Sequence, residues 1–354
     1  MLKFQSLLAS NRIDQLPDII LIEDYKAHKF FDYFPNFFTD ISKNIDLSKF
    51  ADYKVKVSTE QDKQYGVPFD SGIVGTFIRS DLFENAGIPL NDLEDLTWDK
   101  FIEYGKQLKA KTGYSLFAIN KADSGLLKII LHSSGSWYFD NNEKLFIINN
   151  ESLKEAFKVI KKLDQNNLIE YSENWTDYLL AFQQNKVAVI LSGCWIIPSI
   201  EVIQSQKGNW RLVKLPKLDD IPTATHYSNI GGSQWYVNNY SKKKELAIDF
   251  LKETFASNEE LVNDLALDIS LISVLKDTSR ITNYDIPNNF FGGQKIYKAL
   301  VSWTNKIPPV KYGIFDEEVE QELHFALDRY LEGEDLDIVL QDADTLIRQQ
   351  IDIE

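Results

Sequence analysis

The chain has 354 residues, which suggests about two domains at roughly 100–200 residues each. Apolar residues make up 44% of it and charged residues 26%, ordinary proportions that allow a large core and argue against disorder. Its formal net charge of −15 repels phosphate backbones and anionic lipids, so nucleic-acid binding and membrane-surface roles are disfavoured.

The first part of the chain predicts the end of a helix followed by a strand. Residues 1–10 resemble the last turns of a helix, and they contain no basic segment followed by an apolar one, so they are not a signal peptide. Residues 19–22 form a short, continuous apolar run after Pro17. Such a run predicts a strand that is buried on both faces and therefore lies in a parallel sheet.

The middle of the chain alternates between strand and helix patterns. A stretch rich in breakers at 65–72 leads into another apolar run. After Thr97, an N-cap residue, apolar residues recur at helical spacing until Gly113 stops the helix. Residues 187–191 again predict a buried strand, and Pro198 can open the helix that follows. The apolar residues of the helix after Thr97 are Phe101, Tyr104 and Leu108.

Further amphipathic helices are predicted from apolar side chains at helical spacing. Their stripes are Leu153, Phe157 and Ile160; Leu246, Phe250 and the pair Leu251/Phe255; Val319, Leu323, Ala326 and Tyr330, ended by Gly333; and Leu336, Leu340, Ala343 and Ile347. Strands that alternate with helices predict an α/β architecture. No apolar run approaches the roughly 18 residues of a membrane span.

Residue types that usually build catalytic or metal sites lack suitable neighbours in the sequence. No histidine lies at metal-ligand spacing from another histidine or a cysteine, so we predict no metal site. The histidines are His28, His132, His226 and His324. No nucleotide-binding glycine motif occurs, and the single cysteine, Cys194, is predicted to be buried and inert. Carboxylates are abundant, so a glycosidase-like pair remains open.

Three segments lie where open α/β sheets bind ligands, beyond the carboxyl ends of strands. They are residues 23–25, 65–72 and 193–195, and each offers an aromatic ring, a carboxylate or both. Rings and carboxylates suit a neutral polyhydroxylated ligand, whose C–H faces stack and whose hydroxyls form hydrogen bonds. Taken alone, these residues fit ordinary loops around a core equally well.

A series of motifs runs along nearly the whole chain in a recognisable order. They are LPDIILIEDY (16–25), YGVPFDSG (65–72), RSDLFENAGI (79–88), TWDKFIEYGKQLKAKTG (97–113), SSGSWYFDNNEKL (133–145), NKVAVILSGCWIIPS (185–199), SNIGGSQWYV (228–237), NFFGGQKIY (289–297) and IPPVKYG (307–313). In this order they resemble the family 1 extracellular solute-binding proteins. These are the sugar-capture subunits of ABC importers related to maltose-binding protein.

The resemblance implies a two-lobed, periplasmic-binding-protein-like (class II) α/β fold with a sugar in the cleft between the lobes. The N-terminal lobe would comprise 1–70 and 234–283, and the C-terminal lobe 76–227 and 284–354. Hinge segments would lie at about 70–75, 228–233 and 280–284. The residues implied to bind the ligand are Asp24 and Tyr25 from the first loop, Asp70 from the first crossing, Trp137 and Trp195, Gly232 and Ser233 from the second crossing, and Tyr312 near the final crossing.

By the same resemblance, the protein binds its ligand without changing it and needs no cofactor. We expect a carbohydrate ligand, ABC permease subunits as partners, and a monomer that closes about its hinge. The expected location is extracellular and membrane-anchored. A carbohydrate-active enzyme, such as a glycosidase, is the alternative from another class.

The front of the chain departs from the family pattern. Family members begin with a signal peptide, an anchor cysteine, and a strand and helix whose loop lines the cleft, and this chain lacks them. We therefore expect a shortened N-terminal lobe with one unpaired sheet position, an exposed edge and exposed apolar surface. A remnant that no longer binds sugar is a further alternative.

Overall fold

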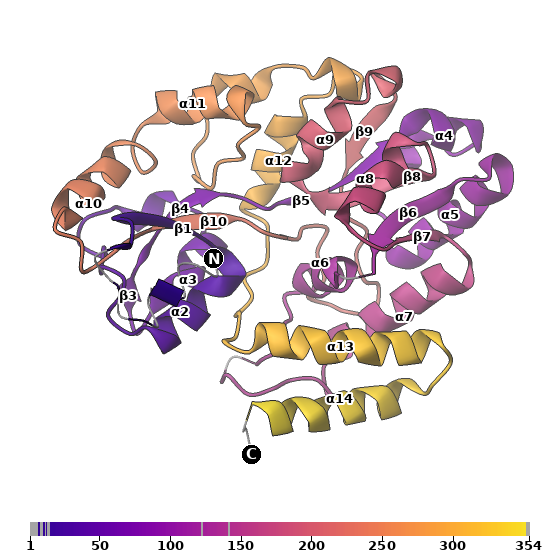
Figure 1. Cartoon of the computed structure of the whole chain (residues 1–354). Coiled ribbons are helices and arrows are strands. Elements are labelled where there is room, and N and C mark those ends of the chain that lie inside the picture. Colours follow the sequence, from indigo (N-terminus) through magenta and orange to yellow (C-terminus); the bar gives the residue numbers. More distant parts are fainter. Residues whose placement is uncertain are drawn as a thin grey trace.

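The computed structural model describes residues 6–7, 10, 12, 15–121, 123–140 and 142–351. Two separate sheets lie on opposite sides of the molecule, each with helices against it (Figure 1). The first has the order β1-β10-β4, formed by Ile19–Glu23, Ser233–Val237 and Gly66–Asp70. The second has the order β7-β6-β8-β5-β9, formed by Ile169–Ser172, Ser115–Asn120, Val187–Gly193, Val74–Arg79 and Trp210–Val213. A small hairpin pairs β2 (Thr59–Glu60) with β3 (Lys63–Gln64). The helix end predicted at 1–10 falls mostly outside the described residues.

The first sheet is antiparallel in the part of the chain that the structure describes. Strand β1 pairs with β10 from Ile19↔Val237 to Glu23↔Ser233, and β10 pairs antiparallel with β4. The strand predicted at 19–22 is confirmed, but its predicted place in a parallel sheet, buried on both faces, is wrong. Leu21 is 40% exposed because β1 is an edge strand of this sheet and Leu21 borders the cavity described below. An apolar run alone does not encode the direction of its neighbour.

The second sheet has parallel strands at its centre. Strand β8 pairs parallel with β6 and antiparallel with β5, and it is buried along most of its length. Strand β6 also pairs parallel with β7. The buried strand predicted at 187–191 is therefore confirmed, with a parallel neighbour on one side. Because β6, β7 and β8 run in the same direction, their carboxyl ends at Asn120, Ser172 and Gly193 meet at one edge of the sheet.

The helix signals predicted at Thr97, Gly113 and Pro198 are confirmed. Thr97 caps α5 by accepting a hydrogen bond from the Lys100 N–H at 3.3 Å, and Gly113 ends it with a φ of 81°. Pro198 lies in the first turn of α9, as predicted. The helices are α2 (Ala27–Tyr33), α3 (Asp52–Val57), α4 (Ser80–Asn85), α5 (Trp98–Thr112), α6 (Gly125–Ser133), α7 (Glu151–Gln165), α8 (Trp175–Gln183), α9 (Ile197–Glu201), α10 (Lys244–Glu253), α11 (Glu259–Asp268), α12 (Ile296–Thr304), α13 (Asp316–Leu331) and α14 (Leu336–Gln350).

The apolar stripe predicted for α10 is wrong in detail. Leu246 and Phe250 are exposed, whereas Ala247, Ile248 and Leu251 are buried. Two apolar stripes lie next to each other on this helix, and the buried one belongs to a core cluster that contains Val67 of β4 and Val237 of β10. The stripes predicted at 153–160, 319–330 and 336–347 match α7, α13 and α14, the last two of which form a hairpin below the space between the sheets (Figure 1).

Two chain segments cross side by side between the sheets. The first links β4 to β5 and the second enters β10, and they pair at Ile73↔Asn229. The Gly72 N–H donates to Asn229 Oδ1 at 2.9 Å, and Gly72 O accepts from the Ile230 N–H at 2.9 Å. A Cβ at Gly72 would lie 2.3 Å from Ile230 O, so this crossing admits no side chain. No helix in the described ranges is both long and apolar enough to cross a membrane.

Candidate functional site

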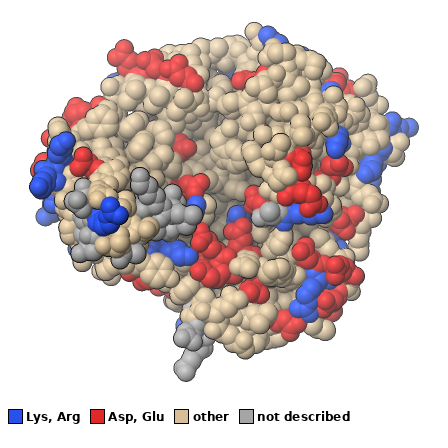
Figure 2. Space-filling model, in the orientation of Figure 1, with Lys and Arg blue, Asp and Glu red and all other residues tan. Residues whose placement is uncertain are grey.

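A cavity of about 730 Å³ opens between the two sheets. Its walls come from the loop after β1, the two crossing segments, the ends of the five-stranded sheet and the start of α13. Figure 2 shows this hollow in the middle of the molecule, with acidic side chains gathered around it. The lining residues are Leu21, Glu23, Tyr25, Lys26, Asp70, Asp123, Lys128, Trp137, Trp195, Asn229, Ile230, Gly231, Gly232, Ser233, Tyr312, Asp316, Glu317 and Glu320.

The structure brings most of the predicted binding residues together around this cavity. Tyr25, Asp70, Trp137, Trp195, Gly232, Ser233 and Tyr312 line it. Asp24 does not line it, because its side chain is only 1% exposed and lies behind the wall. The role of each residue in binding stays a prediction.

Trp195 presents the most accessible ring among the predicted residues. It is 43% exposed, and its Nε1 donates to Ile230 O at 3.0 Å, so the ring is fixed across the second crossing segment. A Cβ at Gly193 would lie 2.2 Å from that Nε1. Glycine at this position is therefore what allows the ring to fold back over the end of β8.

Trp137 and Tyr312 form a deeper, buried part of the wall. Their rings meet edge to face, with centroids 5.0 Å apart and planes at 89°. Trp137 Nε1 donates to Asp316 Oδ2 at 2.8 Å, and the Gly313 N–H donates to Asp316 Oδ1 at 3.0 Å. Burial raises the pKa of the Asp316 carboxyl to about 8, and these two donors offset only part of that rise.

Asp70 and Ser233 join the two strands at the cavity floor. The Ser233 N–H and its hydroxyl both donate to Asp70 Oδ1 at 2.7 Å. These bonds tie the end of β4 to the start of β10, immediately beside the crossings. Both residues are thus held in place before any ligand arrives.

A buried ion pair lies behind Gly232. Lys54 Nζ donates to Asp24 Oδ2 at 2.6 Å, and the lysine side chain is fully buried. Gln234 Nε2 donates to Lys54 O at 2.9 Å and to Asp24 Oδ1 at 3.4 Å. Burial raises the pKa of Asp24, and attraction to the ammonium group counteracts it. A Cβ at Gly232, whose φ is +84°, would lie 2.9 Å from Lys54 Nζ, so the pair requires glycine in the wall.

His132 links the second crossing to the segment that precedes Tyr312. Its Nδ1 and Nε2 lie 3.0 Å from Asn229 O and Pro308 O, respectively. Burial lowers the pKa of its imidazole to about 4, so the ring is neutral near pH 7 and donates to one carbonyl. Cys194 is buried, as predicted, and burial raises the pKa of its thiol.

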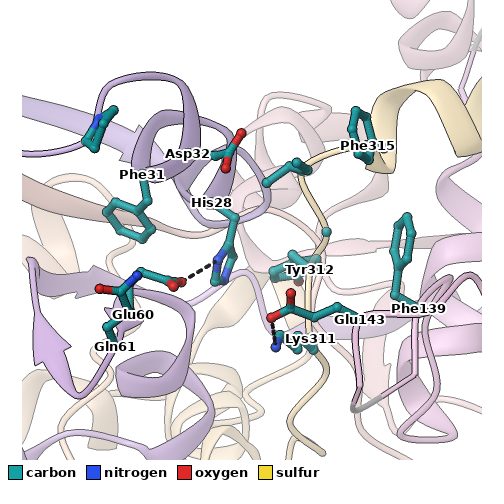
Figure 3. Close-up of a pocket in the computed structure, with 13 residues that line it drawn as sticks. His28, Phe31, Asp32, Glu60, Gln61, Phe139, Glu143, Lys311, Tyr312 and Phe315 are labelled. Carbon is teal, nitrogen blue, oxygen red and sulfur yellow. Dashed lines mark hydrogen bonds and ion pairs between the residues drawn. The ribbon is translucent and has the colours of Figure 1, made fainter. Parts of the chain in front are cut away.

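A second cavity, of about 410 Å³, lies beyond Tyr312 (Figure 3). Phe31 on α2 faces it from one side, and Phe139 and Phe315 face it from the other. Its charged groups are partly paired, since His28 Nδ1 lies 3.6 Å from Glu60 Oε2 and Lys311 contacts Glu143. Because Tyr312 lines this cavity and the larger one, the two together continue the space between the sheets past the buried Tyr312 ring.

The sequence reasoning missed two lining positions that follow parallel strands. Asp123 comes shortly after β6, and Trp175 comes shortly after β7 and borders a smaller adjoining cavity. The signal was present, because both residues lie beyond carboxyl ends of parallel strands. It was missed because residues 115–120 and 169–172 were not recognised as strands.

The arrangement suits binding better than group transfer. Rings, fixed carboxylates and backbone groups converge on a space large enough for a small oligosaccharide. Among the described ranges, no cluster of three or more His, Cys, Asp or Glu side chains is positioned to hold a metal ion.

Two sheets joined by crossing segments, with a ring-lined cavity between them, define a two-lobed binding protein. The sequence model of one family, the bacterial extracellular solute-binding proteins, matches residues 3–285 of this chain. The chain belongs to this family. Because the family consists of solute-binding proteins, the glycosidase alternative has no support.

Similar proteins extend the comparison. A lactose-binding protein of Rhizobium radiobacter is 38% identical over 339 residues, which cover 96% of this chain and 80% of the relative. An arabinooligosaccharide-binding protein of Bacillus subtilis is 24% identical over 280 residues, covering 75% of this chain and 62% of the relative. The solved structure of an ABC-transporter-associated binding protein from B. animalis subsp. lactis Bl-04, in complex with β-1,6-galactobiose, has a TM-score of 0.77 at 19% identity, covering 98% of this chain and 87% of that one. The sugar-binding protein MalE of Xanthomonas citri has a TM-score of 0.79 at 18% identity, covering 98% and 86% of the two chains. These likenesses confirm the two-lobed fold.

Proposed function

We propose that this protein binds a neutral mono- or oligosaccharide in the cavity between its sheets and delivers it to the permease of an ABC transporter. The observation that carries the proposal is the convergence of Trp195, Trp137 and Tyr312 with fixed carboxylates around about 730 Å³ of space. Aromatic faces stack on the C–H faces of a sugar, and carboxylates accept hydrogen bonds from its hydroxyls. The names of its relatives, which bind lactose and arabino-oligosaccharides, support the same ligand class.

The charge of the cavity favours a neutral ligand over an anionic one. Six of its lining residues are carboxylic acids, and two are lysines. Both lysines are already engaged, since Lys26 lies 2.8 Å from Glu23 and Lys128 lies 2.8 Å from Glu320. An incoming uronate or phosphate would meet carboxylates without a free cation to offset them.

The proposal includes hinge closure. The N-terminal lobe is taken as 1–70 and 234–283, the C-terminal lobe as 76–227 and 284–354, with hinges at about 70–75, 228–233 and 280–284. The paired crossings at Ile73 and Asn229 support the first two hinges. A sugar that contacts both lobes favours the closed state, because those contacts exist together only there. We further propose a monomer that works outside the cell, anchored to the membrane, with the permease reading the closed state.

Calorimetry against a sugar panel tests the function. Lactose, maltose, arabinobiose and β-1,6-galactobiose are titrated, and each mixture is then analysed by chromatography. We expect saturable binding of at least one sugar, an unchanged ligand, and stabilisation of about 2.7 kcal/mol at 100 times its Kd. Absence of binding by every sugar would contradict the proposal, and conversion of the ligand would revive the enzyme alternative.

A further inference from the structure

Two exposed tryptophans stand next to each other at the edge of the cavity. Trp175 is 45% exposed and Trp195 is 43% exposed, and their ring centroids lie 5.8 Å apart at an angle of 45°. Single exposed apolar residues are normal on protein surfaces, but adjoining exposed tryptophans are typical of binding sites.

The backbone holds Trp175 in this position. It is the first residue of α8, whose N-cap Asn174 accepts a hydrogen bond from the Asp177 N–H at 3.0 Å. One face of its ring stacks on Tyr178, with centroids 5.2 Å apart and planes at 25°. Tyr178 is buried, so Trp175 rests on a fixed support and does not depend on a ligand for its orientation.

The two rings flank the end of β6, because β6 lies between β7 and β8 in the sheet. A small cavity of about 70 Å³ lies between them, and its lining includes Asn120, Asp123 and Ser192. It adjoins the larger cavity, since Asp123, Trp195 and Ile230 line both. This pocket has about a tenth of the volume of the larger cavity, so we assign to it one small substituent of the ligand, such as a hydroxymethyl group, and not a whole sugar ring.

We propose that Trp175, with Asp123, forms a second sugar subsite beyond Trp195, which makes the preferred ligand a neutral oligosaccharide of at least two units. The first unit lies in the large cavity against Trp195. The second lies on the exposed ring of Trp175, places one small substituent in the adjoining pocket, and donates a hydroxyl hydrogen bond to Asp123. This inference rests on the proposed sugar-binding function and adds the length of the ligand and the direction in which it extends.

The opposite direction offers less exposed aromatic surface. There the wall consists of Trp137 and Tyr312, both buried and packed edge to face against each other. The cavity beyond Tyr312 carries His28 beside Glu60 and Lys311 beside Glu143, so these four groups are already paired (Figure 3). The stacking surface for another unit is therefore on the Trp175 side.

The test compares matched ligands on single variants by calorimetry: galactose with lactose, glucose with maltose, and arabinose with arabinobiose. We expect Trp175→Ala to weaken disaccharide binding about tenfold, equivalent to about 1.4 kcal/mol, while monosaccharide binding stays within about twofold. Trp175→Phe should restore most of the loss, because it keeps a flat ring. Phe325→Ala removes an exposed ring of α13 outside both cavities and should change neither affinity.

Other outcomes would overturn the inference. If Trp175→Ala lowers the melting temperature but leaves disaccharide affinity unchanged, the role of Trp175 is only structural, through its packing on Tyr178. An equal loss for both ligand lengths would place Trp175 in the first subsite, and a selective loss in Phe315→Ala would show that the ligand extends past Tyr312. A wild-type protein that binds only monosaccharides would refute the second subsite and leave the proposed function standing, whereas one that binds no sugar would refute the function itself.

Discussion

The two walls of the cavity are built on different principles. The wall from the five-stranded sheet faces the ligand space with rings, of which Trp195 and Trp175 are widely exposed. The wall from the three-stranded sheet faces it with the backbone of Gly231 and Gly232, with the Asp70–Ser233 pair and with the partly buried ring of Tyr25. A buried ion pair, Lys54 with Asp24, lies behind that backbone.

Because of this difference, we expect substitutions in one wall to change mainly ligand affinity and substitutions in the other to change mainly folding stability. On the ring side, the exposed rings of Trp195 and Trp175 contribute little to the core, so their loss should show up in affinity. On the backbone side, the surface exists only because a buried network supports it, so damage should show up in stability first. Substitutions on each side test whether the two walls differ in this way.

The largest effect is expected at the buried ion pair. Lys54→Met leaves the Asp24 carboxylate buried without its cation, which typically costs about 3–5 kcal/mol of folding stability. The free energy of unfolding, measured by denaturant titration, should fall accordingly. The double variant Lys54→Met/Asp24→Asn should recover part of the loss, because no uncompensated charge remains. A single variant as stable as the wild type would show that the network does not support this wall.

A pH-dependent effect is expected at Asp316, smaller because the substitution Asp316→Asn breaks no buried ion pair. Its pKa is raised to about 8 in the folded protein, above the usual value near 4. The native state therefore holds a proton that the unfolded state releases, so its contribution to stability is complete below about pH 4 and is lost as the pH rises towards 8.

Unfolding measured from pH 4 to pH 8 for the wild type and Asp316→Asn isolates this contribution. The difference in stability between the two should change in favour of the variant as the pH rises. His132, whose pKa is lowered to about 4, acts in the opposite direction but is common to both proteins. Parallel pH profiles would mean that Asp316 is ionised in the folded state.

The ring side is tested at Trp195. Trp195→Ala removes an exposed stacking surface, and truncation of such an anchor can cost about 2 kcal/mol of binding, roughly a 30-fold loss of affinity. The melting temperature without ligand should change by only a few degrees, since loss of a buried tryptophan would instead cost about 3–5 kcal/mol of stability. Early melting with normal sugar affinity would make Trp195 a core residue.

The sequence placed Trp195 at the cavity correctly, whereas it misplaced the side chain of Asp24. Trp195 could be placed because a buried strand and a Ser-Gly-Cys turn precede it, and both features are local. Asp24 follows a strand in the same way, yet its carboxylate turns inward because Lys54, 30 residues later, provides a buried partner. A pairing between residues so far apart leaves no local pattern, which is also why the antiparallel neighbour of β1 was not foreseen.

The smallest effect is expected at an ion pair that joins the two sides. Lys29 of α2 donates to Glu317 Oε2 at 3.0 Å and to Glu318 Oε1 at 3.2 Å, both at the start of α13. If the proposed hinge opens, these contacts break, so they should favour the closed state. Exposed pairs are worth about 0.2–1 kcal/mol, so Lys29→Ala should weaken sugar binding by up to about fivefold. The loss should shrink at 1 M salt, where the screening length falls to about 3 Å.

Lys162→Ala breaks a pair with Asp99 between α7 and α5, which lie on the same side, and should leave affinity unchanged. Equal effects of the two substitutions would show that the Lys29 contact does not report closure.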